Sequence, residues 1–316
     1  MKNTHLVTGA FGYSGSRIAT RLLDAGHQVR TLTHSPQSDH ALASRVQASH
    51  YRFDDPVALA SALEGVDVLT NTYWVRFKAD GFSQEVAVQN TCRLFEAARK
   101  AGVRRVVHVS ITNPTLDSPY EYFSSKAELE AVLEESGLDH VILRPAVIYG
   151  AGDILVNNIA WTLRQSPIFG LFGDGSYRLQ PIWVEDFADL AVRAGRGETE
   201  RIVDAVGPES FTYRELVEML AEVMGLRRYM VELPPSVGLL AARVMGFLVR
   251  DVMLTRSEIG ALMDGLLDTN SPPAGAMKLS NWARDNASEL GRHYASELAR
   301  RTLAPRDGAQ VCAAVG

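Results

Sequence analysis

The chain has 316 residues, enough for one large core and a smaller appended lobe, because single cores stop growing near ~250 to 300 residues. Hydrophobic residues make up 46% and charged residues 22%, which is typical of a globular protein and argues against disorder or a fibrous repeat. The net charge of −5 argues against a nucleic-acid-binding protein and favours a small-molecule partner.

The two cysteines, Cys92 and Cys312, support neither a disulfide framework nor a metal site. No apolar signal core precedes the first strand, so we expect a cytoplasmic protein without bound metal. The most apolar stretch, residues 237–249, is interrupted by Arg243 and is shorter than the ~20 residues that cross a bilayer. We therefore predict no transmembrane segment, and leave open peripheral membrane contact and a homodimer.

Short apolar runs alternate with helical patterns along the first half of the chain, which predicts strand-helix units of a parallel sheet. The helices before two of the strands end at Gly102 and Gly137, where a left-handed C-cap forms easily. Six strands before Gly150 predict a Rossmann-like, doubly wound parallel α/β sheet. The clearest runs are residues 5–8, 28–33, 66–70, 105–110 and 140–144.

After Gly150 the helical segments become longer, which predicts a second lobe. Residues 180–184 and 185–194 are typical of a strand and a helix, so we expect 180–206 to return to the first domain. The predicted division is a dinucleotide-binding domain (1–150 with 180–206), a smaller, mostly helical substrate or lid lobe (151–179 and 207–304), and a loose tail (305–316).

Three glycines, Gly9, Gly12 and Gly15, stand where the first strand passes to the first helix. Glycine permits a tight turn, a close approach of phosphate to the backbone and close strand-helix packing. The free N–H groups and the dipole of the helix attract a pyrophosphate. The spacing differs from Gly-x-Gly-x-x-Gly, but the strand-turn-helix context favours dinucleotide binding over a flexible loop. The turn residues expected to contact the cofactor are Thr8, Gly9, Phe11, Gly12, Tyr13 and Gly15.

No carboxylate follows the second strand, where NAD-binding proteins place one for the adenosine ribose. Arg17, Arg21 and His34 are instead available for a 2′-phosphate, so we favour NADP and keep NAD as an alternative. The other interpretation of the arginines is ordinary solvated helix residues. After the third strand, Asp54 is a candidate partner for the adenine amine, with a solvated turn as the alternative.

Tyr122 and Lys126 are four residues apart, which places them on one face of a predicted helix. A phenol has a pKa of ~10, and a neighbouring cation favours the phenolate, so the pair can exchange a proton. Ser110 ends a strand at the sheet edge where open sheets bind ligands, and its hydroxyl can polarise a carbonyl. The alternative is a capping serine and a packing tyrosine.

With these motifs and Leu143–Gly150, residues 3–191 resemble extended or atypical members of the short-chain dehydrogenase/reductase superfamily. Residues 72–76 and 110–114 are similar to the nucleotide-binding accessory subunit of respiratory complex I. The resemblance implies that Tyr122 donates or accepts the proton, that Lys126 binds the nicotinamide ribose and lowers the pKa of Tyr122, and that Ser110 holds the carbonyl.

The segment after the fourth strand departs from the family pattern. Asn71 and Thr72 are candidates for cofactor contacts there, as is Pro145 after the sixth strand. The bulky Tyr73 and Trp74 replace small residues, and either line the cofactor pocket or partly fill the active site.

We predict an NAD(P)-dependent oxidoreductase that transfers hydride between NADP(H) and a carbonyl or alcohol substrate. The alternatives are a nucleotide-sugar epimerase or dehydratase, and a non-catalytic NAD(P)H-binding sensor or assembly protein. The apolar helical segment 234–254 is assigned to core packing or to a lid, with contact to a membrane surface or a partner as further alternatives.

Overall fold

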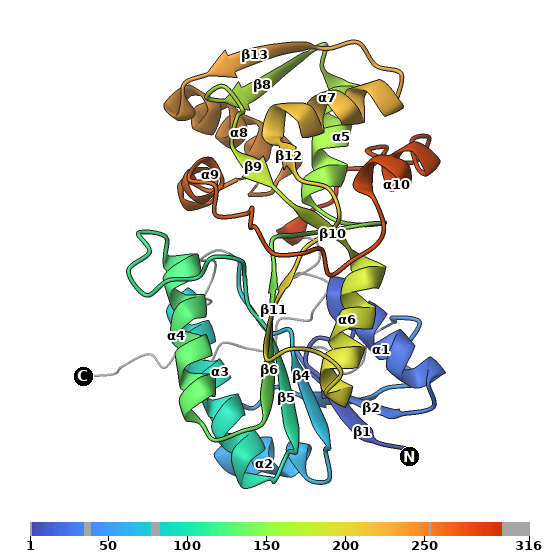
Figure 1. Ribbon diagram of the computed structural model, residues 1–316, viewed down its shortest axis with the longest axis vertical. Helices are drawn as coiled ribbons and strands as arrows, with labels where there is room; N and C mark the ends of the chain where they lie inside the picture. The colour runs from blue at the N-terminus through green and yellow to red at the C-terminus, as the bar shows by residue number, and fades with distance from the viewer. Residues whose placement is uncertain (1, 35–38, 77–82, 253, 299–316) are drawn as a thin grey trace, which may run out of the picture.

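The computed structural model describes residues 2–34, 39–76, 83–252 and 254–298, and shows a sheet domain with a second lobe above it (Figure 1). The predicted tail, residues 305–316 with Cys312, lies outside the described residues.

The sheet domain is built on seven parallel strands in the order β11-β6-β5-β4-β1-β2-β3. The strand order reverses between β1 and β4, and ligands of such sheets bind outside the carboxyl ends at this point. The predicted doubly wound parallel sheet is therefore confirmed. The strands are β1 (Thr4–Val7), β2 (Gln28–Thr33), β3 (Gln47–His50), β4 (Val68–Asn71), β5 (Arg105–Val109), β6 (His140–Pro145) and β11 (Ile202–Ala205).

Helices cover both faces of the sheet (Figure 1). On one face, Ile18 and Phe187 from α1 (Tyr13–Asp24) and α6 (Val184–Arg196) share a buried cluster with Val107 of β5. On the other, Leu94 and Leu129 share a cluster with Ile142 of β6. The helices of that face are α2 (Pro56–Leu63), α3 (Gln84–Lys100) and α4 (Glu121–Glu135). The buried hydrophobic positions at helical spacing thus dictate which side of each helix meets the sheet.

The second lobe has its own core, in which Tyr149, Leu216 and Trp282 are buried. Its helices are α5 (Leu155–Gln165), α7 (Tyr213–Val223), α8 (Pro235–Val249), α9 (Arg256–Met263) and α10 (Leu279–Asp285). Short strand pairs accompany them: β8 (Ile168–Phe172) with β13 (Tyr229–Leu233), and β9 (Arg178–Leu179) with β12 (Phe211–Thr212). A further pair, β7 (Val147–Tyr149) with β10 (Pro181–Trp183), lies where the chain passes between the lobes.

The chain returns from the second lobe to the sheet domain through α6 and β11. The β11 strand extends the sheet beside β6, and α6 packs along α1. The arginines of α1 form ion pairs with the acids of α6: Arg21 pairs with Glu185 and Asp189, and Arg17 with Glu185. These ion pairs join residues more than 160 positions apart in the chain. They hold α6 against α1, the helix that follows the glycine turn.

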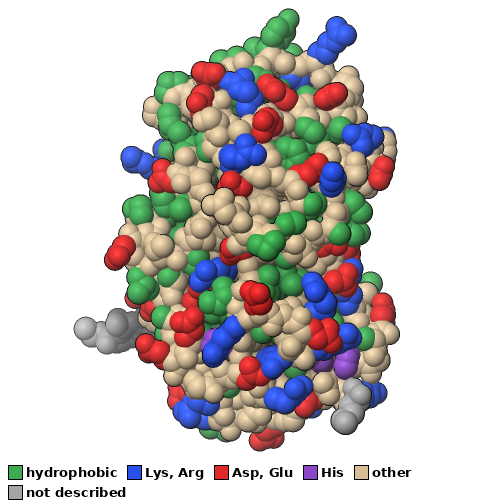
Figure 2. Space-filling model, viewed as in Figure 1, with side chains coloured by type: hydrophobic (Ala, Val, Ile, Leu, Met, Phe, Trp, Pro, Cys, Tyr) green, Lys and Arg blue, Asp and Glu red, His purple; other side chains and the backbone are tan. Residues whose placement is uncertain are grey.

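The surface carries both signs of charge without a basic stripe on the visible face (Figure 2). Within the described ranges, no helix combines the length and the apolar character needed to cross a membrane. One face of α8 is nevertheless apolar and exposed, with Phe247 85% accessible. Core packing therefore accounts for only one side of this helix.

Candidate functional site

The glycine turn after β1 has the geometry of an anion cradle. Gly9 has a φ of +67°, and its N–H donates to the carbonyl oxygen of Leu32 at 3.2 Å. A Cβ on Gly15 would lie 2.2 Å from the carbonyl oxygen of Gly9, so only glycine fits there. Gly12 is the N-cap of α1 and makes no side-chain capping bond. The first N–H groups of a helix lack intrahelical partners, so this end of α1 can bind a phosphate through its backbone.

Thr8 and the residues after β4 hold the turn in place. The Thr8 hydroxyl oxygen accepts hydrogen bonds from the N–H groups of Thr72 at 2.7 Å and Tyr73 at 3.0 Å. The Thr72 hydroxyl donates to the carbonyl of Thr8. Asn71 is fully buried, and its amide contacts Thr8, Tyr73 and His108. The side chains of Thr8, Asn71 and Thr72 thus join β1 to β4, and they position the turn.

The two aromatic residues of the turn point to different neighbours. The Phe11 ring centroid lies 5.4 Å from that of His40. Tyr13 extends toward Gly150, because a Cβ on that glycine would lie 3.1 Å from the tyrosine oxygen. Tyr13 therefore lies where β7 ends and the chain leaves for the second lobe. Pro145 is buried at the end of β6, and its carbonyl oxygen accepts a hydrogen bond from the N–H of Thr112 at 3.2 Å.

The groups predicted for a 2′-phosphate already have partners. Arg17 lies 3.0 Å from Glu185, and both side chains are partly exposed. Burial, with a smaller effect from His50, lowers the pKa of His34, so its ring is neutral near pH 7. A phosphate here would compete with Glu185 for the α1 arginines, and the role of Arg17 and His34 remains a prediction.

Aromatic rings gather at the carboxyl ends of β2, β3 and β4, next to the turn. Tyr51 lies 5.0 Å from His34, 4.8 Å from Phe53 and 5.2 Å from Tyr73, measured between ring centroids. Such rings offer flat surfaces for stacking. The sequence motifs did not select Tyr51 and Phe53 as site residues. The available signal is that these two aromatic residues occupy alternate positions directly after a polar strand. The neighbouring Asp54 is exposed, and its contact with an adenine remains a prediction.

Ser110 and Lys126 meet at the end of β5. Lys126 is buried in α4, and its ammonium donates to the carbonyl oxygen of Val109 at 2.8 Å. The Ser110 hydroxyl is buried and has no partner among the described residues. The Ser110 hydroxyl is therefore available to a ligand or a water molecule at the carboxyl edge of the sheet.

Trp74 lies against both Lys126 and Tyr122. Its ring centroid is 4.1 Å from the Lys126 ammonium, and 5.5 Å from the Tyr122 ring in an edge-on arrangement. The buried Trp74 Nε1 also lacks a partner in the described part of the chain. The bulky residue after β4 therefore partly covers the two side chains that the family resemblance places in the reaction.

Burial changes the pKa values of both side chains. It lowers the pKa of Lys126 to about 7, against a smaller opposing effect of Glu130. Burial and the Glu258 carboxylate raise the pKa of Tyr122, and Arg76 opposes this. Tyr122 is therefore protonated at neutral pH in this arrangement. The effect of Lys126 on the pKa of Tyr122 stays a prediction, and the Trp74 ring contacts both side chains.

Helix α9 of the second lobe covers this site. Glu258 pairs with Arg76 from the segment after β4, and Ala261 packs with Ile111 and Phe123. Tyr122 packs against the same cluster. The pair of Arg76 with Glu258 joins residues that are 182 positions apart in the chain. No local sequence pattern predicts that α9 packs over this site.

Comparison with known proteins identifies the family. Residues 9–155 match the NAD(P)H-binding family model. The chain is 32% identical to sterol demethylase protein B of Methylococcus capsulatus, over 73% of this chain and 78% of that protein. It is 30% identical to UDP-glucose 4-epimerase of Mycolicibacterium smegmatis, over 84% of this chain and 96% of that enzyme. The chain belongs to the extended short-chain dehydrogenase/reductase superfamily. The predicted family and its NAD(P) cofactor are confirmed.

A further relative and a solved structure are also similar to this chain. The chain is 24% identical to the complex I alpha subcomplex subunit 9 of Arabidopsis thaliana over 78% of its own length, and it spans 64% of that subunit. The structure of Citrobacter triphenylmethane reductase complexed with NADP(H) aligns with a TM-score of 0.74 at 17% identity, over 90% of this chain and 99% of that one. This likeness shows the fold alone. The glycine turn, the unpartnered Ser110 hydroxyl and the buried Lys126 fit a dinucleotide laid across the switch point of the sheet.

Proposed function

We propose that this chain is an NADP(H)-dependent oxidoreductase that transfers a hydride between the nicotinamide and a carbonyl or alcohol. The main support is the Ser110 hydroxyl, which is buried and has no partner among the described residues. Lys126 of α4 bonds the carbonyl of Val109 at the end of the same strand, and Tyr122 lies one turn before Lys126 in α4. Ser110 follows β5 at the carboxyl edge of the sheet, where open sheets bind ligands, and the bond from Lys126 to Val109 supports its place beside this strand end.

The backbone of Gly9, Gly12 and the first turn of α1 would hold the pyrophosphate, and Lys126 would hold the nicotinamide ribose. When bound, the dinucleotide supplies the hydride. Ser110 would donate a hydrogen bond to the carbonyl oxygen of the substrate and orient it, while keeping its proton. Tyr122, whose pKa is raised by burial, keeps its proton at neutral pH and donates it to the same oxygen as charge develops there.

The absence of an acid after β2 and the two arginines on α1 support the preference for NADP. Residues 29–38 contain no carboxylate that could repel a 2′-phosphate. Arg17 and Arg21 supply positive charge on the neighbouring helix. Both pair with Glu185, and a 2′-phosphate would have to replace these pairs. Calorimetric titration with NADPH and NADH tests this preference, and tighter binding of NADH would reverse it.

A second candidate is non-catalytic binding of the dinucleotide, and one observation favours it. Trp74 lies on the Lys126 ammonium and against Tyr122, so both are covered in this arrangement. A sensor or assembly protein needs no path from Tyr122 to a substrate. An enzyme needs Trp74 and α9 to move on substrate binding.

The deciding experiment compares Tyr122→Phe with the wild type in NADPH consumption, with 9,10-phenanthrenequinone as the carbonyl probe. General acid catalysis predicts a kcat reduced ~10² to 10⁴-fold, with the Kd for NADPH unchanged. The control is Tyr149→Phe, which removes another tyrosine hydroxyl that bonds the carbonyl of Met277 in the second lobe. Unchanged turnover in Tyr122→Phe removes the assigned role. Binding of NADPH without turnover by the wild type favours the second candidate.

A further inference from the structure

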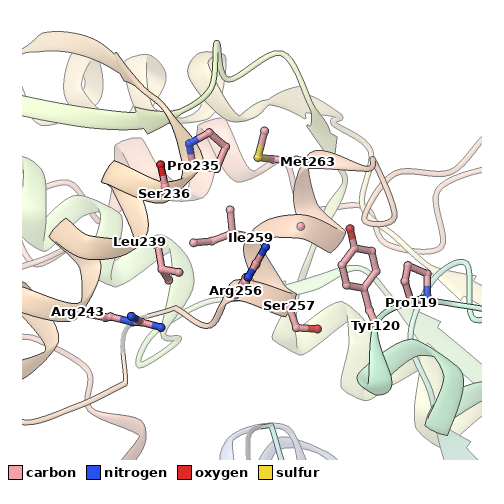
Figure 3. Close-up of a pocket in the computed structure, with 11 residues that line it drawn as sticks. Pro119, Tyr120, Pro235, Ser236, Leu239, Arg243, Arg256, Ser257, Ile259 and Met263 are labelled. Atoms are coloured by element: carbon pink, nitrogen blue, oxygen red, sulfur yellow. The ribbon is translucent and has the colours of Figure 1, made fainter.

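A cavity of about 1030 Å³ lies between α8 and α9 of the second lobe and the segment that leads into α4 of the sheet domain. Figure 3 shows side chains from α8 on one side of this space, and side chains from α9 with Pro119 and Tyr120 on the other. The volume lies just above the ~300 to 1,000 Å³ of pockets that hold drug-sized molecules. The cavity is therefore large enough for a ligand with an extended apolar part.

The wall of this cavity is apolar, with basic groups near solvent. Leu239, Ile259 and Met263 supply aliphatic and thioether surface. Arg243 and Arg256 line the same space, and both side chains are exposed. Neither arginine has an ion pair with any described residue, and no carboxylate is among the described lining residues. An apolar wall with two unpaired guanidinium groups complements an amphipathic anion.

The cavity and the proposed reaction site lie on opposite faces of α9. Arg256, Ile259 and Met263 face the cavity, whereas Glu258 and Ala261 face the region of Tyr122. The helical period of 3.6 residues places these two sets about half a turn apart. α9 thus lies between most of the cavity wall and Tyr122, whereas Tyr120 both lines the cavity and packs against the same cluster as Tyr122.

We propose that this cavity binds a single-chain amphipathic carboxylate, with its alkyl chain along Leu239 and Ile259 and its carboxylate paired with Arg243 and Arg256. Arg243 belongs to α8, whose Leu240 and Val244 are exposed apolar side chains, and Arg256 begins α9. The site is distinct from the cofactor site, so its existence does not depend on the proposed reaction.

The test is calorimetric titration of the full chain with dodecanoate below its micelle concentration, with dodecanol as the uncharged probe. We expect saturable dodecanoate binding that Arg243→Gln with Arg256→Gln weakens at least tenfold, because charge-assisted hydrogen bonds are lost. Dodecanol binding should be the same in both proteins. Arg227→Gln, an exposed arginine outside the cavity, is the matched control and should bind dodecanoate as the wild type does.

A second variant, Ser236→Trp, fills the cavity from an exposed position without a change of charge, and should weaken both probes. Absent dodecanoate binding, or equal binding in the arginine double variant, overturns the proposal. Binding to phosphatidylglycerol vesicles without dodecanoate binding also overturns it, and assigns the arginines to a lipid surface. NADPH titration of the same proteins separates this result from the proposed function, since either site can fail alone.

Discussion

The substitution Gly15→Ala tests the glycine turn most directly. In an ordinary helix, replacement of glycine by alanine stabilises by ~1 kcal/mol. Here the added Cβ would lie 2.2 Å from the carbonyl oxygen and 2.9 Å from the carbonyl carbon of Gly9. Because both atoms are backbone, the turn itself must shift, and overpacking of this kind costs ~1 to 3 kcal/mol. We expect the sign of the effect to reverse, with a net loss of unfolding free energy.

The same shift moves the N–H groups that would face the pyrophosphate. Loss of one charge-assisted hydrogen bond costs ~1.5 to 3 kcal/mol, which is a Kd about ten- to a hundredfold higher. Urea unfolding gives the stability and calorimetry with NADPH gives the Kd. Gly26→Ala is the control: it has a φ of +82° and open space around it, so it should lose ~1 to 2 kcal/mol of stability from strain and keep its affinity. A Gly15→Ala protein that is more stable and binds NADPH normally would refute the reasoning.

Two further predictions concern the covered side chains. The pKa of Lys126 is about 7 in the folded chain and ~10.4 when unfolded, so the unfolded state binds more protons between these values. The stability of the wild type relative to Lys126→Met should therefore rise with pH, by up to ~1.4 kcal/mol per unit from pH 7 to 9, in urea unfolding. A difference independent of pH would contradict a buried, poorly charged lysine. Trp74→Leu should remove most of the tryptophan fluorescence quenching caused by NADPH, whereas quenching retained in full would place the nicotinamide elsewhere.

Local sequence determined the first half of the sheet domain. Apolar runs such as 105–110 predict their strands because a parallel strand buried on both faces is a nearly continuous apolar run. Gly102 and Gly137 adopt the positive φ that is expected after a helix. The turn at Gly9 and Gly15 was recognisable because strand, turn and helix are contiguous in the chain. Ser110 also lies directly after its strand, as the pattern predicts.

Only the tertiary structure decided what surrounds these residues. The sequence left Arg17 available for a phosphate, and the fold pairs it with Glu185 because α6 packs on α1. The sequence placed Tyr122 and Lys126 on one helix face. The Trp74 ring that contacts both, and Glu258 on α9, come from distant segments. Such contacts depend on how helices and lobes pack, and periodicity within one element carries no information about its distant neighbours. The sequence therefore determined the glycine turn and the strands around it, and long-range packing of Trp74 and α9 determined how Tyr122 and Lys126 are covered.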